Sequence, residues 1–211
     1  MKRIIQTVSV FAILLWFVSC QSSPASIELF NGKDLNGWLG YTDPEGNADN
    51  ADVFKVKDGC IWISGIPFGY LRTEKVYEDY ILHVEWRWDG PATNSGLFQR
   101  LALPDKTFPN AIEVQLCVGK AGDFVLLGGA KINETKETGP FPVVQMKNPS
   151  NEKPVGEWNT ADITCKGDTI EVIINGLLQN KATGAPTSGY IALQSEGGPI
   201  MFRNIKLTPL K

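Results

Sequence analysis

The chain has 211 residues, with 20 Lys plus Arg against 23 Asp plus Glu and a net charge of −3. Removing residues 1–19 takes away two basic residues and no acidic one, so the remaining 192 residues carry 18 basic and 23 acidic side chains, a net charge of −5. This balance argues against a nucleic-acid binder, which needs a basic surface to meet phosphates. The length is enough for one sizeable core, particularly in an all-β sandwich.

The N-terminus has the pattern of a secretory signal. Met1-Lys2-Arg3 is basic, residues 4–18 are almost wholly apolar, and small and polar residues follow at 19–26. The apolar run is too short for a comfortable membrane span, and its order predicts a signal peptide over residues 1–19. The alternatives are a plain secreted protein cut near this point and an uncleaved signal anchor.

The end of the signal predicts a lipid anchor. Phe17-Val18-Ser19-Cys20 resembles a relaxed bacterial lipobox, which makes Cys20 the candidate lipid-attachment residue and residues 20–26 a flexible tether. Acyl chains on such a cysteine hold a protein on a membrane surface without a spanning helix. We therefore expect an exported protein of the bacterial cell envelope, in the periplasm or on the outer membrane surface, that touches the membrane only through this anchor.

The remaining cysteines, Cys60, Cys117 and Cys165, match no metal-binding spacing, and three cannot all pair internally. Cys60 and Cys165 lie in strand-like runs, which favours buried thiols. One disulfide in an oxidising envelope is the alternative.

Short alternating or β-branched runs between Gly, Pro, Asn and Asp predict an all-β domain over residues 27–211, with no linker and no repeat. Asn175-Gly176 tolerates the positive φ of a tight turn and predicts a hairpin over 169–181. The long polar segment 128–156 contains Gly139-Pro140-Phe141-Pro142, and a loop of this length often borders a site. The predicted strands are 53–56, 60–64, 80–88, 96–101, 111–118, 123–127, 158–166, 169–174, 189–194 and 200–207.

The period of two along each strand separates a core face from an outer face. In 80–88, the residues Leu82, Val84, Trp86 and Trp88 share one face, and the polar residues share the other. In 111–118, apolar residues again alternate with polar ones. If the strands are neighbours in one curved sheet, its open face gathers forked hydrogen-bonding groups suited to a ligand rich in hydroxyls. The members of this predicted face are Glu85, Arg87, Arg100, Glu113, Gln115 and Gln194. The alternative is an ordinary solvated sheet face.

Several motifs, in order, resemble those of the 3-keto-disaccharide hydrolase domain family. They run from the opening Leu29-Phe30-Asn31-Gly32-Lys33-Asp34 to the closing Phe202-Arg203-Asn204-Ile205, and the likeness covers about residues 27–210. Between them, Asn94-Ser95-Gly96 resembles the family's Asn-Ser-Gly segment and Glu113-Val114-Gln115 its Glu-x-Gln strand. The resemblance implies a two-sheet antiparallel jelly-roll sandwich of the concanavalin A-like type, whose concave face binds carbohydrate and whose members cleave glycosides oxidised at the third carbon.

That reaction needs one base, because a ketone at carbon three acidifies the hydrogen on carbon two. Loss of that proton starts elimination of the glycosidic oxygen, and hydration completes the cleavage. The enolate calls for a hydrogen-bond donor or cation, either a guanidinium or a bound divalent metal, and the metal's identity is left open. Two-glutamate jelly-roll glycanases carry Glu-x-Asp-x-x-Glu on one strand, and this chain has Glu113-Val114-Gln115-Leu116-Cys117-Val118 there, so that chemistry is not expected.

Glu113 is the candidate base, and Glu196 a second candidate base or ligand. Arg100 and Arg203 are candidate enolate or hydroxyl binders. Glu85, Arg87, Gln115 and Gln194 are expected to line the site. The chain departs from the family pattern in two places: Cys117-Val118 stands where many members have Asp, and Ser195-Glu196 where many have His. The alternatives are a carbohydrate-binding lipoprotein of a glycan-uptake system without catalysis, and a scaffold whose polar face is solvated.

Overall fold

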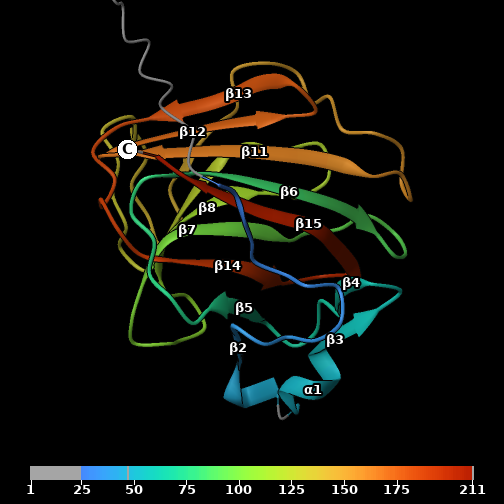
Figure 1. Cartoon of the computed structure of the whole chain (residues 1–211). Coiled ribbons are helices and arrows are strands. Elements are labelled where there is room, and N and C mark those ends of the chain that lie inside the picture. The colour runs from blue at the N-terminus through green and yellow to red at the C-terminus, as the bar shows by residue number, and fades with distance from the viewer. Residues whose placement is uncertain (1–24, 47, 211) are drawn as a thin grey trace, which may run out of the picture.

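The computed structural model describes residues 25–46 and 48–210. The predicted signal peptide and Cys20 therefore lie outside the described residues. Two antiparallel sheets make up most of the rest, as expected for an all-β sandwich (Figure 1). A short helix, α1 (Asn50–Val53), and the 3-10 turn Pro44–Gly46 precede the first hairpin. Among these described residues, no helix has the length and apolar character needed to cross a membrane.

The first sheet has eight strands, and much of it lies across the upper part of Figure 1. Its order is β13 (Leu177–Ala182), β12 (Thr169–Ile174), β11 (Asn159–Lys166), β6 (Tyr80–Trp88), β15 (Ile200–Pro209), β4 (Cys60–Ile63) and β3 (Phe54–Lys57), with β1 (Ile27–Glu28) paired to β15.

The second sheet has seven strands. Its order is β10 (Val143–Val144), β9 (Phe124–Leu127), β8 (Asn110–Gln115), β7 (Gly96–Ala102), β14 (Tyr190–Ser195), β5 (Gly69–Thr73) and β2 (Trp38–Thr42). Because β6 and β15 belong to the first sheet and β7, β8 and β14 to the second, the chain passes between the two sheets several times. Sequence neighbours such as β6 and β7 are therefore not neighbours in one sheet.

The core lies between the sheets, where the predicted alternation holds. Leu82, Val84 and Trp86 of β6 are fully buried, and so are Ile112 and Val114 of β8. Burying side chains of this size stabilises the fold by roughly 1.5–3 kcal/mol each. The apolar residues of both strands thus contribute to the core between the sheets. The polar residues of β6 and those of β8 lie on the opposite outer sides of the sandwich.

The predicted turns and thiols are also found. Asn175 and Gly176 have φ values of 47° and 80°, and they close the β12–β13 hairpin. Cys60, Cys117 and Cys165 are free thiols, and Cys60 and Cys165 are buried.

The opening motif of the chain has a structural role. The Asn31 side-chain oxygen accepts hydrogen bonds from the backbone N–H groups of Lys33 and Asp34, at 2.8 and 3.0 Å. The Trp38 indole N–H donates to the Leu29 carbonyl oxygen at 2.7 Å, and the Trp38 ring is buried in the core. The motif therefore fixes the entry of the chain into β2, a strand that the sequence patterns did not predict.

Candidate functional site

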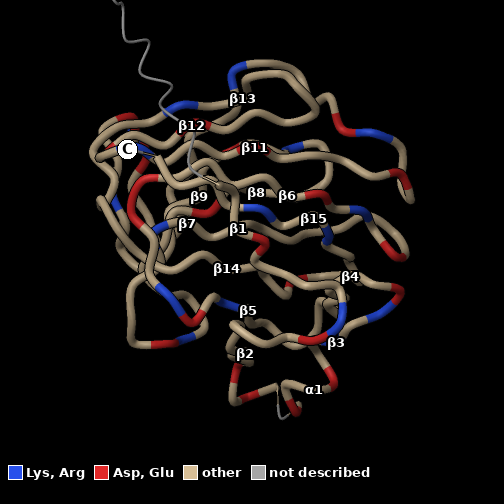
Figure 2. The backbone as a smooth tube through the Cα atoms, viewed as in Figure 1, with Lys and Arg blue, Asp and Glu red and all other residues tan. Residues whose placement is uncertain are grey.

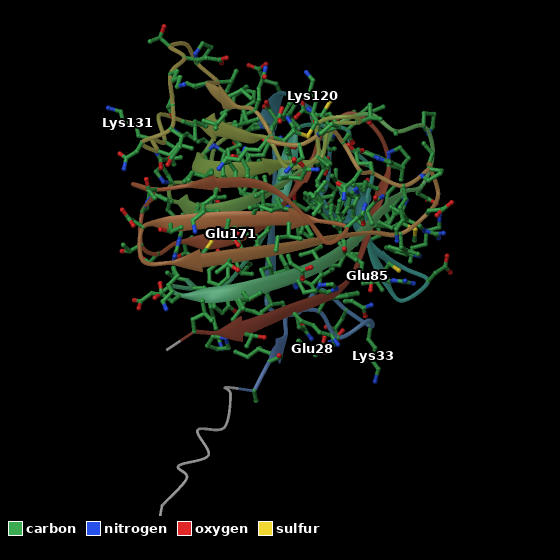
Figure 3. All side chains as sticks on the ribbon, turned by 90° about the horizontal axis from the view of Figure 1, so that it is seen from above. Glu28, Lys33, Glu85, Lys120, Lys131 and Glu171 are labelled. Atoms are coloured by element: carbon green, nitrogen blue, oxygen red, sulfur yellow. The ribbon has the colours of Figure 1, made fainter. Side chains whose placement is uncertain are left out.

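The predicted polar face is divided between two surfaces. Glu85 and Arg87 lie on β6 and Arg203 on β15, in the eight-stranded sheet, whereas Glu113 and Gln194 belong to the seven-stranded sheet. The prediction that all of them share one concave patch is wrong. Alternation of polar and apolar residues does not show to which sheet a strand belongs, and these strands belong to two sheets whose polar faces point in opposite directions. Figure 3 shows the labelled Glu85 beside β6 and β15, while Lys131 lies on the other side of the sandwich.

Arg100 is also not part of a common patch. Its φ is 56°, and the β7–β8 register shifts between Gln99 and Ala102, so a bulge breaks the alternation there. The Arg100 side chain is buried, donates from Nη1 to the Tyr77 carbonyl oxygen at 3.0 Å and lies 5.4 Å from the Tyr80 ring centroid. It holds one end of the sandwich together and does not reach the pocket described below.

On the eight-stranded sheet, both oxygens of the Glu85 carboxylate accept hydrogen bonds. Arg203 Nε donates to Glu85 Oε2 at 2.7 Å, and Asn204 Nδ2 donates to Glu85 Oε1 at 2.7 Å. His83, the lone histidine, has its Nδ1 2.7 Å from Asp162 Oδ1. Burial raises the pKa of Glu85, but the hydrogen bonds from Asn204 and Arg203 outweigh burial, so the pKa lies below its ordinary value.

Arg87 and Arg203 both lie over the Trp158 ring, with their guanidinium carbons 4.9 and 3.9 Å from its centroid. Such cation–π stacking uses the ring and the guanidinium planes together. Figure 2 shows acidic and basic residues interspersed, with neither sign dominating the view. The Glu85 carboxylate is therefore paired on this surface, whereas Arg87 Nε is buried without a hydrogen-bond partner among the described residues.

The outer side of the seven-stranded sheet holds a pocket of about 220 Å³. Its polar lining comes from the end of β8, the end of β14 and the segment before β7. Its apolar lining comes from β9 and from three phenylalanines on separate loops. The lining residues are Phe68, Asn94, Phe108, Glu113, Gln115, Val125, Leu127, Phe141, Gln194 and Glu196. Of the predicted site residues, the structure thus brings together Glu113, Gln115, Gln194 and Glu196.

The Asn-Ser-Gly segment builds the floor of this pocket. Gly96 pairs with Gln115, and a Cβ at Gly96 would collide with the Glu113 carboxyl group. The missing side chain at this position therefore leaves the space that the Glu113 side chain occupies. Ser95 Oγ donates to the Gln194 carbonyl oxygen at 2.9 Å, which fixes β14 beside the start of β7. Ser95 and Gly96 thus place Glu113 and Gln194 in one pocket.

Three buried oxygen atoms of the pocket have no hydrogen-bond partner within the part of the chain that the structure describes. They are Glu113 Oε1, Gln194 Oε1 and Asn94 Oδ1. Glu113 is 2% exposed and Gln194 is 3% exposed, so bulk water does not solvate them fully. A buried acceptor without a donor costs roughly 1–3 kcal/mol. The fold keeps these acceptors unpaired at a pocket wall, which is the arrangement expected where a ligand supplies the donors.

Two carboxyl groups in the pocket have perturbed titration. Burial, and then the nearby Glu196 charge, raise the pKa of Glu113 well above its ordinary value. Burial also raises the pKa of Glu196, although hydrogen bonds from Asn94 and Gln194 oppose the rise. Gln194 Nε2 donates to Glu196 Oε2 at 2.9 Å. A carboxylate with a raised pKa binds a proton more strongly than an ordinary one, which suits it to proton transfer near neutral pH.

Gln115 is held so that one of its groups remains available. Its Oε1 accepts hydrogen bonds from the backbone N–H groups of Leu116 and Cys117, both at 3.0 Å. These bonds end β8 at Gln115, three residues before the predicted end, and Val118 is 51% exposed. Because the amide oxygen is engaged, the Gln115 NH₂ group is left to donate to a ligand.

The pocket was tested for a divalent metal. Within residues 25–46 and 48–210, no three His, Cys, Asp or Glu side chains gather in a group that could hold a metal ion. The pocket offers two charged groups, Glu113 and Glu196, beside amide oxygens of the kind that hard cations accept. This donor set falls short of a dedicated divalent-metal site.

A larger cavity of about 580 Å³ lies under the 129–142 loop. Its lining contains glycine, proline, threonine and aliphatic residues together with Lys131 and one acidic residue, Glu137, which already accepts from the Val143 N–H at 3.1 Å. Size alone favours this cavity, but its lining has a single carboxyl group and not a pair. We therefore assign the smaller pocket as the candidate site, and the prediction that segment 128–156 borders it is confirmed through Phe141.

Six residues of the pocket lining were not predicted as site residues, and two of them, Val125 and Leu127, were predicted only as part of a strand. Asn94 was quoted only as part of a motif, and Phe141 only as part of a Gly-Pro-Phe-Pro segment. Phe68 and Phe108 lie on loops next to strands, where alternation gives no information on direction. The motif and the long loop were the available signals for Asn94 and Phe141, and the sequence held none for Phe68 and Phe108.

Comparison with known proteins adds the family. The chain is 25% identical to the 3-keto-disaccharide hydrolase of Bacteroides thetaiotaomicron, over 87% of this chain and 78% of that protein. A predicted glycosyl hydrolase from Parabacteroides distasonis superposes with a TM-score of 0.67 at 23% identity, covering 88% of this chain and 94% of that one.

A Bacillus licheniformis beta-glucanase shares the architecture, with a TM-score of 0.58 at 15% identity over 90% of this chain and all of that one. The fold is therefore the expected jelly roll. The sequence profile of the 3-keto-alpha-glucoside-1,2-lyase-like domain matches residues 25–208. Since this match covers most of the chain, the protein belongs to the 3-keto-alpha-glucoside-1,2-lyase-like domain family.

Proposed function

We propose that this protein cleaves glycosides whose sugar carries a ketone at carbon three, with Glu113 as the base. Family membership and the likeness to a 3-keto-disaccharide hydrolase support the substrate class. The observation that carries the proposal is the buried Glu113 carboxyl, which has a raised pKa and an unpaired oxygen at the pocket wall.

The reaction has two steps. Ionised Glu113 takes the proton from carbon two, and the C–H electron pair forms an enolate with the ketone at carbon three. The electron pair of the enolate then forms a double bond between carbons one and two, and the bond from carbon one to the leaving oxygen breaks. The leaving oxygen takes up a proton. Water then adds across the double bond, so the sum is hydrolysis to a 3-keto sugar and an alcohol. A positioned base typically accelerates such a step by roughly 10²–10⁴-fold.

The enolate oxygen needs a donor, and neither Arg100 nor Arg203 lies in the pocket lining. The Gln115 NH₂ group fills this role, because its amide oxygen is already engaged by backbone N–H groups. The proton that Glu113 removes from carbon two passes to the leaving oxygen, because burial and the nearby Glu196 charge make Glu113 the carboxyl group of this pair that binds a proton more strongly. Gln194 holds Glu196 in place through the 2.9 Å hydrogen bond. Donors aimed at developing charge in a shielded site stabilise it more than water does.

The test is direct. The domain lacking residues 1–26 is incubated with a 3-keto-disaccharide, and released sugar is measured with EDTA and with added divalent metal. We expect release in both conditions, since no step needs a metal. Binding of the sugar without release would instead support a non-catalytic carbohydrate-binding protein. Release that EDTA abolishes would show that a divalent metal takes part.

We also propose that the protein is exported and lipid-anchored in the bacterial envelope. The support is the basic start, the apolar run and Cys20. Cys20→Ser removes the thiol that carries the lipid, so the variant should move from the membrane fraction to the soluble fraction. Unchanged membrane association of this variant would contradict the proposal.

A further inference from the structure

The orientation of the Gln194 amide is fixed by the carboxylate beside it. Gln194 Nε2 donates to Glu196 Oε2 at 2.9 Å, and Gln194 is 3% exposed. A carboxylate accepts hydrogen bonds and donates none, so only the NH₂ end of the amide can pair with it. The amide oxygen, Oε1, has no hydrogen-bond partner within residues 25–46 and 48–210. Glu196 therefore leaves Gln194 with an acceptor, and not a donor, for a ligand.

The position of Glu196 is fixed by the tight turn that follows it. Gly197 has a φ of 81° and pairs with Asn94 in an isolated parallel bridge. A Cβ at Gly197 or at Gly198 would collide with Thr93 Oγ1, so the turn packs directly against the segment before β7. Burial raises the pKa of Glu196, and hydrogen bonding from the Asn94 side chain opposes this rise. The carboxylate that orients the Gln194 amide is thus in place before a ligand binds.

The Gln194 amide lies in the same part of the pocket as the Glu113 carboxyl group. Strand β7 runs between β8, which carries Glu113, and β14, which carries Gln194. Leu193 pairs with Leu97, so the antiparallel register places Gln194 beside Gly96. The Glu113 carboxyl group occupies the space of the Cβ that Gly96 lacks. Both side chains therefore reach the pocket next to Gly96, and each has an oxygen atom without a hydrogen-bond partner among the described residues.

The chemistry of a 3-keto sugar offers one group that matches the Gln194 oxygen. Carbon two carries both the hydrogen that Glu113 removes and a hydroxyl group, so an acceptor beside Glu113 lies near that hydroxyl. The ketone oxygen at carbon three and the glycosidic oxygen at carbon one have no hydrogen to donate. The hydroxyl on carbon two is therefore the nearest donor, and a buried acceptor without a partner favours a ligand that supplies one.

We propose that Gln194 Oε1 accepts a hydrogen bond from the hydroxyl on carbon two, so that the pocket selects sugars with a donor at this position. Glu196 is the positioning residue for the Gln194 amide. The inference rests on the proposed function, which places carbon two beside Glu113. Without the Glu196 carboxylate, the Gln194 NH₂ group loses the acceptor that holds it, and the amide can turn this group toward the ligand. The pocket then discriminates less against a ligand that lacks a donor at carbon two.

The test compares methyl α-D-glucopyranoside with methyl 2-deoxy-2-fluoro-α-D-glucopyranoside, whose fluorine replaces the hydroxyl and cannot donate. Dissociation constants are measured by NMR titration. The parent should bind the hydroxyl ligand about tenfold more tightly, and this ratio should fall below about threefold in Gln194→Met and in Glu196→Met. Glu196→Gln keeps an oxygen that can accept from Gln194, so its ratio should lie in between. Gln145→Met, the same change at an exposed glutamine outside the pocket, is the matched control and should keep the parental ratio.

This measurement separates failure of the inference from failure of the hydrolase function, because neither ligand is cleaved. A preference of the parent for the hydroxyl that Gln194→Met removes supports the inference even if no 3-keto glycoside is cleaved. No such preference in the parent, or the same loss of affinity for both ligands in Gln194→Met, would overturn it even if cleavage is found. A parental ratio in Glu196→Met would overturn the positioning role of Glu196.

Discussion

Glu85 and Glu113 lie on the outer sides of the two sheets, and their carboxyl groups differ in hydrogen bonding. On the eight-stranded sheet, Glu85 is matched by Arg203 and Asn204, and both of its carboxylate oxygens are occupied. On the seven-stranded sheet, Glu113 is more deeply buried, has an unpaired oxygen and lies near a second carboxyl group, Glu196. The first arrangement lowers the pKa of its carboxyl group and the second raises it.

This difference distinguishes a stabilising network from a reactive pocket. A carboxylate that accepts hydrogen bonds from cationic and amide donors contributes to stability and resists protonation. A carboxyl group that is buried without such donors makes the folded state less stable, and its persistence calls for a reason other than folding. Strand alternation alone ranks Glu85 and Glu113 equally, and only the pairing of their oxygens separates them.

The largest expected effect is on catalysis by the unpaired carboxyl. Glu113→Gln keeps the shape of the side chain but cannot accept the proton, so turnover of a 3-keto glycoside should fall on the order of 10²–10⁴-fold. Glu85→Gln, the matched change on the other sheet, should leave turnover unchanged. Steady-state kinetics on both variants measures this. Full activity in Glu113→Gln would remove Glu113 from the mechanism and shift the role of base to Glu196.

The next effect concerns the core that both sheets share. Trp86 is fully buried between them, and Trp86→Ala should lower the free energy of unfolding by roughly 3–5 kcal/mol. The Trp86 indole N–H has no partner, so Trp86→Phe should cost clearly less than Trp86→Ala. Urea unfolding followed by circular dichroism provides both values. A Trp86→Ala protein as stable as the parent would show that the face assignment of β6 is inverted.

A smaller effect is expected when the paired network is broken. Glu85→Gln replaces a charged acceptor of Arg203 with a neutral group, and the free energy of unfolding should fall by about 1 kcal/mol near neutral pH. The same unfolding assay measures it. Unchanged stability would mean that the Glu85 network is no more than a surface ion pair.

The smallest effect is a pH dependence of opposite sign at the two positions. The raised pKa of Glu113 means that the folded state holds its proton more tightly, so this group favours folding at low pH and loses that contribution as pH rises through the raised pKa. Because the pKa of Glu85 is lowered, this group stabilises the folded state at pH values above the ordinary pKa of glutamate. That stabilisation is lost as pH falls through the lowered pKa. The stability of Glu113→Gln relative to the parent should therefore increase as pH rises. The stability of Glu85→Gln relative to the same parent should increase as pH falls. Parallel pH profiles of the two variants would contradict this contrast.

Many strand positions and faces could be predicted from the sequence because they are local, although β2 and β5 were not predicted. The period of two correctly placed Trp86 in the core and Glu113 outside, and the Asn175-Gly176 turn was found as expected. The partition of strands between sheets could not be predicted this way, because β6 pairs with β11 and β15, which lie far along the chain. The bulge at Arg100 also reversed a direction that strict alternation had assigned outward.

We propose that Glu113 removes the proton from carbon two, and that Glu85, which strand alternation also assigns to an outer face, does not. Exchange of that hydrogen with deuterium oxide, followed by NMR on a 3-keto glycoside with the parent, Glu113→Gln and Glu85→Gln, tests it most directly. We expect deuterium at carbon two of the substrate or product with the parent and with Glu85→Gln, and exchange slowed to the uncatalysed rate with Glu113→Gln. Exchange at the parental rate in Glu113→Gln, or its loss only in Glu85→Gln, would contradict the claim.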